Sequence, residues 1–177
     1  VTGVQTCALP IFKIKTLSKG MIAQLHLALV ISIDARLLVL DEPTLGLDIT
    51  YRKRFYRQLL DDYMTGERTV LITTHQVEEI EALLTDIMFL HDGEIVLDSP
   101  MENIGSQFVQ LVVADTAAAE ADKLAPIYTE PRLGKTMMIF RGVQPDRLAP
   151  LGQISTPSLS DLFVTLMQCQ DAVAGEA

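Results

Sequence analysis

Cysteine, positive charge and long apolar runs are all scarce in this sequence of 177 residues. Its two cysteines, Cys7 and Cys169, fit neither a disulfide framework nor a metal-binding spacing, which suits a reducing compartment. The longest apolar stretch, residues 25–33 (LHLALVISI), is far shorter than the roughly 20 residues that span a bilayer. Lysine and arginine number 14 against 23 acidic residues, and no basic stripe occurs. This balance argues against binding to a nucleic-acid backbone.

What the chain does have is enough apolar residues to fold. Hydrophobic residues make up 49% of the sequence, so we do not expect disorder. The length leaves room for one domain, or for part of one domain and a small appendage.

The first half of the chain shows an alternation of helices and strands. Residues 18–33 form a predicted helix with Ser18 as N-cap, and Thr50 to about Met64 form a second one, before a turn at Gly66. Residues 36–43 (RLLVLDEP) and 69–75 (TVLITTH) are predicted strands, buried on both faces as in a parallel sheet. This rhythm predicts an α/β domain. On the first helix, one apolar face is expected to comprise Ile22, Leu25, Ala28, Leu29 and Ile33.

Further elements follow the second strand. Residues 77–86 are predicted to be helical, with Ile80, Leu83 and Leu84 on one side. Residues 87–98 are predicted to form a hairpin, because Asp92 and Gly93 can supply the positive φ angles of a type I′ turn. Beyond them, strands are expected at 108–114 and 135–142, a helix at 117–125, and an amphipathic helix at 158–168.

The segment from Leu37 to Asp48 (LLVLDEPTLGLD) carries the strongest chemical signal. A buried strand that ends in Asp41 and Glu42 places two carboxylates at the carboxyl edge of a sheet, where α/β proteins bind ligands. The plain alternative is a strand that ends in a polar loop. Residues 17–21 (LSKGM) at the start of a helix, and His75 after the second strand, favour the functional interpretation.

Taken together, these motifs resemble the second half of an ATP-binding-cassette (ABC) ATPase, the nucleotide-binding subunit of ABC transporters. Residues 17–21 resemble the signature loop LSGGQ, 37–42 the Walker B strand, 45–48 (LGLD) the D-loop, and His75 the switch histidine. The order and spacing match over about residues 12–100. The resemblance implies the carboxyl-terminal part of an α/β P-loop NTPase domain with a parallel sheet core, here residues 12–103. Residues 104–177 are then expected to be a separate small α+β appendage.

The resemblance also implies roles for individual residues and two cofactors, ATP and Mg²⁺. Asp41 would hold Mg²⁺ through water, Glu42 would act as general base on the attacking water, and His75 would contact the γ-phosphate. Ser18, Lys19 and Gly20 would bind the ATP of an opposite ATPase subunit at a helix N-terminus, and Asp48 of the D-loop would also be a cofactor-binding residue. Lys19 and Met21 depart from the family pattern, so we expect a weakened signature loop. His26 and His91 are interpreted as surface or packing residues.

A phosphate-binding P-loop, GxxxxGK[ST], is expected ahead of these motifs. The sequence holds GKT at residues 134–136, but Thr129 stands where the first glycine should be and a strand follows. Residues 1–11 (VTGVQTCALPI) resemble a translated sequencing adapter. We therefore expect them to be a non-native scar that marks a truncated N-terminus.

Three functions are compatible with these motifs. The first is the ATPase subunit of an ABC-2-type exporter, peripheral at the cytoplasmic face of the membrane and docked on a separate permease that selects the substrate. The second is a non-transport ABC ATPase of translation or chromosome maintenance, against which the acidic balance and the lack of heptads count. The third is a catalytically idle binding module, which the carboxylates and His75 disfavour.

Overall fold

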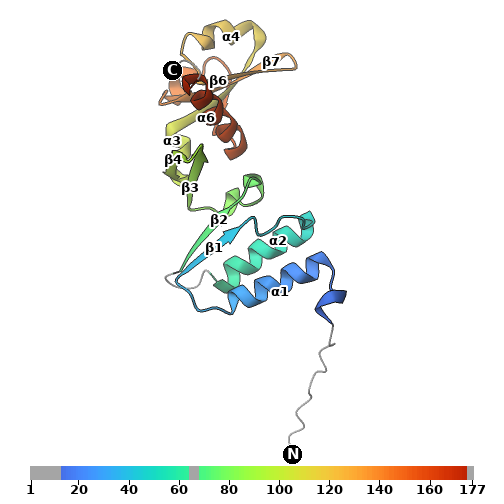
Figure 1. Cartoon of the computed structure of the whole chain (residues 1–177). Coiled ribbons are helices and arrows are strands. Elements are labelled where there is room, and N and C mark those ends of the chain that lie inside the picture. The colour runs from blue at the N-terminus through green and yellow to red at the C-terminus, as the bar shows by residue number, and fades with distance from the viewer. Residues whose placement is uncertain (1–12, 64–67, 175–177) are drawn as a thin grey trace, which may run out of the picture. The chain divides into compact units, whose positions relative to one another are not determined.

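A computed structural model describes residues 13–63 and 68–174 (Figure 1). The chain divides into two compact units, the first ending at Glu79 and the second beginning at Ile80. The expected adapter scar, the end of the second helix at Met64 and the expected turn at Gly66 lie outside the described residues. The expected boundary at 103/104 differs from this division and stays a prediction.

In the first unit, two helices accompany a parallel pair of strands. After a 3₁₀ turn at Ile14–Thr16 come α1 (Lys19–Ile31), β1 (Leu37–Asp41), α2 (Ile49–Gln58) and β2 (Thr69–Thr73). Helix α2 continues as a π-helical turn over Leu59–Tyr63. The two strands pair in parallel, from Leu37 opposite Thr69 to Asp41 opposite Thr73. The predicted α/β architecture with a parallel sheet is confirmed.

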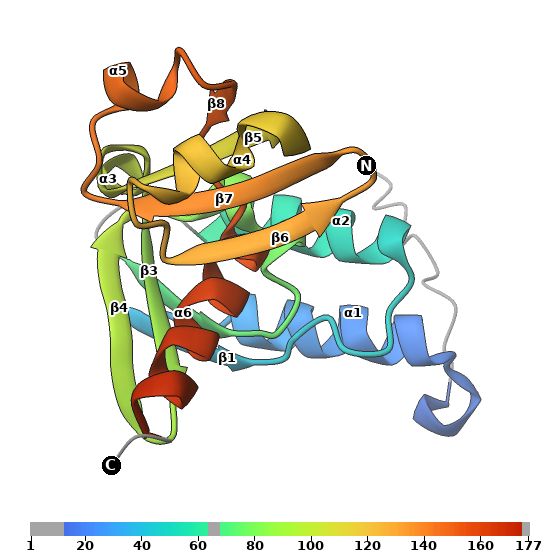
Figure 2. The same cartoon turned by 90° about the horizontal axis from the view of Figure 1, so that it is seen from above.

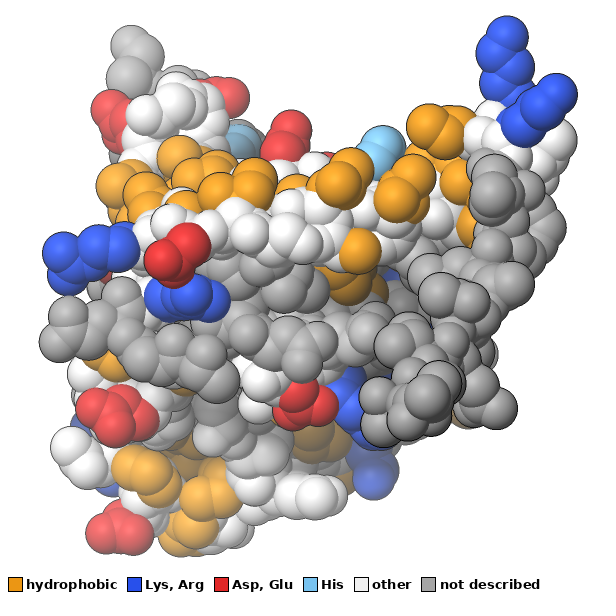
Figure 3. All heavy atoms as spheres, turned by 90° about the horizontal axis from the view of Figure 1, so that it is seen from below, with side chains coloured by type: hydrophobic (Ala, Val, Ile, Leu, Met, Phe, Trp, Pro, Cys, Tyr) orange, Lys and Arg blue, Asp and Glu red, His pale blue; other side chains and the backbone are white. Residues whose placement is uncertain are grey.

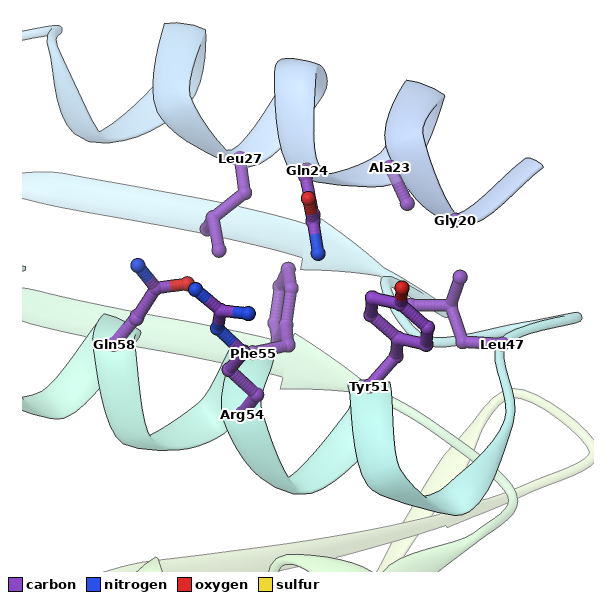
Figure 4. A pocket seen from close by; sticks show the side chains of 9 residues that line it. All are labelled: Gly20, Ala23, Gln24, Leu27, Leu47, Tyr51, Arg54, Phe55 and Gln58. Atoms are coloured by element: carbon purple, nitrogen blue, oxygen red, sulfur yellow. The ribbon is translucent and has the colours of Figure 1, made fainter. Parts of the chain in front are cut away.

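The predicted face of α1 is wrong. Leu27 is the buried residue, at 6% exposure, whereas Leu29 and Ile33 are both 59% exposed. Figure 4 shows Leu27 and Phe55 pointing toward one another between α1 and α2. Because α1 is apolar around almost its whole circumference, its pattern contains no polar side that would fix its orientation.

The two strands are not buried on both faces, contrary to expectation. Both helices lie on the same side of β1 and β2 (Figure 1). The other face presents Leu37 at 56%, Val39 at 57% and Leu71 at 49% exposure. Among the described residues, these three side chains therefore keep about half of their surface exposed. Figure 3 shows one face of the molecule, on which several exposed apolar side chains form a row beside a histidine.

The second unit begins with short helical turns and a hairpin. The predicted helix at 77–86 is two 3₁₀ turns, Val77–Glu79 at the end of the first unit and Glu81–Leu83, and Leu83 is exposed although Ile80 is buried. Strands β3 (Asp86–His91) and β4 (Glu94–Pro100) pair in antiparallel fashion. Asp92 and Gly93 have φ angles of 48° and 83°, so the predicted hairpin turn is confirmed.

A four-stranded antiparallel sheet forms the centre of the second unit. Its order is β6-β7-β5-β8, with β5 at Phe108–Ala114, β6 at Tyr128–Arg132, β7 at Lys135–Arg141 and β8 at Gln153–Ser155. Helix α4 (Asp115–Asp122) lies on one face and α6 (Leu159–Ala174) on the other (Figures 1 and 2). Short helices α3 (Met101–Gln107) and α5 (Pro145–Leu148) complete the unit. The sequence predicts β5, β7, α4 and α6, but not β6, β8, α3 or α5.

Each face of this sheet has its own core. Toward α4, seven buried residues cluster, and Leu111, Ala121, Phe140 and Leu148 among them are fully enclosed. Alternate positions of β5 and β7, including Phe108, Met137 and Ile139, are also fully buried. Helix α6 contributes Leu159 and Leu162, which have no exposed surface.

Candidate active site

The candidate site lies at the carboxyl ends of β1 and β2. Parallel pairing places Asp41 directly opposite Thr73. The Thr73 hydroxyl donates a hydrogen bond to Asp41 Oδ1. The Asp41 side chain remains exposed at the sheet edge. The strand register alone therefore positions this carboxylate where a ligand can reach it.

Glu42 is set apart from the strand by its backbone. Its φ angle of 44° is left-handed, which few residues other than glycine adopt. The Glu42 N–H donates to the Thr73 carbonyl at 2.9 Å, and the Glu42 carbonyl accepts from the Leu45 N–H at 3.1 Å. Such conformations cost about 1–3 kcal/mol and cluster at functional sites. This turn aims the Glu42 carboxylate toward the segment after β2.

The Glu42 carboxylate receives its partners from that segment. Its Oε1 lies 2.6 Å from His75 Nδ1 and accepts the His75 backbone N–H at 3.0 Å. The Thr74 hydroxyl donates to Oε2 at 3.4 Å. The hydrogen bond with the His75 ring holds the pKa of Glu42 below its ordinary value, against a smaller opposing effect of burial. The carboxylate is thus kept ionised, as a general base must be.

A buried hydrogen bond supports the loop that leaves Glu42. The Thr44 hydroxyl, on a residue only 2% exposed, lies 3.1 Å from the Tyr56 hydroxyl of α2. Burial raises the pKa of Tyr56, so this phenol stays protonated. Because buried hydroxyls need partners, the pair fixes the loop over α2.

Asp48 and Ser18 both cap helices. The Asp48 carboxylate accepts the backbone N–H groups of Thr50 and Tyr51 at 3.0 and 3.1 Å, at the start of α2. The Ser18 hydroxyl accepts the Met21 N–H at 3.2 Å, which confirms Ser18 as the N-cap of α1. The structure therefore shows a local role for each, and their roles toward a nucleotide stay predictions.

The signature-like loop meets α2 through Gly20. A side-chain carbon at Gly20 would lie 3.8 Å from the Tyr51 ring, which is ordinary contact. Figure 4 shows Gly20 and Ala23 of α1 beside Tyr51 and Leu47. The space enclosed there, about 10 Å³, is too small for a ligand.

A larger hollow, of about 440 Å³, adjoins the carboxylates. Lys19 and His26 of α1 line it together with Asp41 and Glu42, so one residue of the predicted signature loop shares this hollow with the predicted Mg²⁺ ligand and the predicted base. Its remaining walls are mainly apolar, including Leu40 and other side chains from α1, α2 and the segment after β1. Ser18 and Asp48 are not among the lining residues.

Comparisons of the sequence identify the proteins to which this chain is related. A family model described as "AAA domain, putative AbiEii toxin, Type IV TA system" matches residues 9–81. The ABC transporter ATP-binding protein NatA of Bacillus subtilis is 31% identical over 87 residues, covering 49% of this chain and 35% of NatA. The chain is homologous to the ATP-binding proteins of ABC transporters.

Other relatives carry export in their names. The Nod factor export ATP-binding protein I of Neorhizobium galegae is 30% identical over 115 residues, covering 65% of this chain and 33% of that protein. A fluoroquinolones export ATP-binding protein of Mycobacterium tuberculosis is 40% identical over 86 residues, or 48% of this chain and 28% of the relative. The chain thus spans about a third of the length of the ABC proteins it matches.

The GKT segment belongs to the second unit, where it forms a hairpin turn and the start of a strand. Gly134, with a φ angle of 71°, occupies the turn between β6 and β7, and Lys135 and Thr136 belong to β7. The Thr136 hydroxyl donates to Asp115 Oδ1 at 2.9 Å. The prediction that a strand follows this GKT segment is confirmed. Among residues 13–63 and 68–174, no helix has the length and apolar character of a membrane span.

Several residues that shape the candidate site were not predicted from the sequence. Thr73 binds Asp41, Tyr56 binds Thr44, and Arg52 contacts the segments after both strands. Thr73 could have been found from the strand register, because it is the residue opposite Asp41. No sequence signal marks Arg52, since its partners lie up to 27 positions away.

Proposed function

We propose that this chain contributes to the ATP hydrolysis that energises an ABC exporter. The observation that carries the proposal is the Glu42–His75 contact at 2.6 Å, one residue beyond Asp41 at the carboxyl edge of a parallel sheet. The export functions in the names of two relatives support the transport class. Nucleotide triphosphate hydrolysis needs mainly positioning and stabilisation of charge, which such a fixed polar constellation can supply.

In this proposal Glu42 orients the attacking water and accepts its proton. A carboxylate with a lowered pKa is ionised at neutral pH and available for this role. His75, whose side chain is 63% exposed, can reach the γ-phosphate while Nδ1 remains on Glu42. Loss of the γ-phosphate would then change the position of His75 and, through the Nδ1 contact, the environment of the Glu42 carboxylate.

The donor set at Asp41 fits Mg²⁺ bound to ATP. Among the described residues, no group of three or more His, Cys, Asp or Glu side chains could hold a metal ion by itself. Mg²⁺ in nucleotide sites usually takes one or two carboxylates and completes its shell with waters and phosphates. Asp41, exposed and steadied by Thr73, suits that arrangement. The metal would neutralise charge on the β- and γ-phosphates.

We infer the partners from the relationship to ABC transporter ATP-binding proteins. Ser18, Lys19 and Gly20 would contact the ATP of a second ATPase subunit, with Asp48 in the same shared interface. A permease would carry the substrate path and fix the assembly to the cytoplasmic face of the membrane. The backbone N–H groups at the start of α1 and the positive charge of Lys19 favour a phosphate.

The test uses a hybrid, because the sequence lacks a P-loop pattern. The part of NatA that precedes its matched region is joined to this chain at the start of that region, and MgATP turnover is compared for the hybrid and its Glu42→Gln variant. General-base loss should lower kcat by about 10²–10⁴ while ATP binding persists. Asp41→Asn should instead weaken Mg²⁺-dependent binding.

Two measurements on the hybrid test the assigned base and the assigned second subunit. A folded hybrid that binds MgATP and turns it over equally well with Glu42→Gln would contradict the assigned base. Size-exclusion mass with MgATP tests the shared site, since Glu42→Gln should accumulate as an ATP-bound dimer. A monomer under these conditions would contradict the partner assignment.

A further inference from the structure

Arg52, on the first turns of α2, makes polar contacts with two different loops. Its Nε donates to the Leu47 carbonyl at 2.7 Å. Its Nη1 donates to Glu79 Oε1, also at 2.7 Å, and to Gln76 Oε1. The side chain is only 19% exposed. One guanidinium therefore binds three acceptors in a largely enclosed position.

The acceptors belong to the segments that carry the candidate site. Leu47 directly precedes Asp48 in the segment after β1. Gln76 directly follows His75 in the segment after β2, and Glu79 ends the adjoining 3₁₀ turn. Arg52 thus connects the segment after β1 to the segment after β2 at a point next to His75.

We propose that Arg52 is a positioning residue, which keeps His75 on Glu42 by tying the segment after β2 to that after β1. Its consequence for ATP turnover rests on the proposed function, but the positioning itself does not. The His75 side chain is 63% exposed, so packing covers only the smaller part of its surface. The neighbouring Gln76, anchored by Arg52, supplies the fixed point.

The chemistry of the contact requires arginine. The planar guanidinium directs Nε and Nη1 toward different acceptors at fixed angles, which a lysine ammonium on a flexible stem cannot reproduce. Glu79 Oε2 is buried without a hydrogen-bond partner among the described residues. The Glu79 carboxylate therefore depends on its Oε1 contact with Arg52, and removal of the cation would leave it uncompensated.

A simpler role for Arg52 would be general support of α2. The two roles predict that loss of Arg52 affects different parts of the first unit. If Arg52 positions the loop, its loss affects the His75 segment while the strand pairing stays intact. If it supports the unit, its loss loosens β1, β2 and α2 together.

The experiment measures amide hydrogen exchange by NMR in the 177-residue chain and in R52Q, R52K and K53Q. The reporter is the His75 N–H, which binds Glu42 Oε1, and the internal reference is the Glu42 N–H, which binds the Thr73 carbonyl in the sheet. Lys53 is the matched control, because it is the exposed neighbour of Arg52 on the same helix and carries the same charge.

R52Q should raise exchange at His75 about tenfold or more relative to Glu42, as expected when hydrogen bonds to charged groups are lost. R52K should restore part of the protection, and K53Q should change neither amide. The ¹⁵N signals of the His75 ring provide a second readout, since Nδ1 should lose its Glu42 partner in R52Q. If R52Q does not fold, R52K gives the same comparison at smaller amplitude.

Two results would overturn the inference: unchanged exchange and ring signals at His75 in R52Q, or an equal rise at His75 and Glu42. In the hybrid ATPase assay, R52Q should lower kcat and leave KM for MgATP nearly unchanged. An inactive parent hybrid would count against the proposed function alone, because the exchange result in the 177-residue chain stands without it.

Discussion

The two units of this chain differ in how completely they bury their apolar residues. The second unit encloses both faces of its sheet, and Phe108, Leu111, Ile139 and Phe140 have no exposed surface. The first unit covers one face of its strands and leaves the other open. The first unit has, in addition, a set of polar contacts at the ends of its two strands. Within the described residues, the first unit thus combines a half-covered sheet with a defined set of polar contacts, whereas the second combines a covered sheet with two apolar cores.

The largest expected contrast is between cavities in the two units. Phe140→Ala should destabilise the second unit by about 3–5 kcal/mol, because Phe140 is fully enclosed. Leu27→Ala in the first unit should cost about 2 kcal/mol, at the low end for such changes, since the neighbouring hollow gives the site room to relax. Urea titration followed by residue-resolved NMR measures each unit separately. Equal losses would remove the contrast.

A second contrast uses one substitution at two sheets. Val113→Thr buries a hydroxyl in the second unit, where Val113 is 1% exposed, and should cost about 1–3 kcal/mol. Val39→Thr lies on the open face of β1 and should change stability by less than about 0.5 kcal/mol. The same urea titrations compare the pair. A large loss at Val39 would show that the open face is covered in solution.

A third prediction concerns the buried hydroxyl pair of the first unit. Tyr56→Phe removes the partner of Thr44 and should destabilise the unit by about 1 kcal/mol. Tyr51→Phe is the control, because Tyr51 is 39% exposed. The free energy of unfolding should differ between the two variants. Identical values would mean that the Thr44–Tyr56 contact contributes nothing.

The smallest effect is expected in the pH dependence of the first unit. The folded pKa of Glu42 lies below its ordinary value of 4.5, because of its hydrogen bond with His75. The unfolded chain therefore binds the proton more readily, so the contribution to stability is present above about pH 4.5 and fades as pH falls through the lowered pKa. A ¹³C NMR titration of the Glu42 carboxyl should show this, and His75→Ala should bring the pKa back toward the ordinary value. No change in His75→Ala would contradict the assigned cause.

Much of the secondary structure was predictable because local chemistry determines it. Ser18 caps α1, and Asp92 with Gly93 closes the β3–β4 hairpin, both through short-range backbone preferences. Continuous apolar runs predicted β1, β2, β5 and β7. The runs did not predict β6, where Pro131 interrupts the pattern, or β8, which is three residues long. Short or interrupted strands form only when a neighbouring strand supplies their hydrogen bonds.

Reading the residues in order was enough to predict the chemical groups of the candidate site and the elements on which they lie. The sequence predicted Asp41 and Glu42 at the end of one strand and His75 at the end of the next. The tertiary structure alone decided that Glu42 turns through a left-handed φ angle onto His75, and that Arg52 reaches both loops. It also decided that Leu27, rather than Leu29, faces α2. The physical reason is that capping and turn formation depend on neighbours in sequence, whereas hydrogen-bond partners and burial depend on which distant segments meet in space.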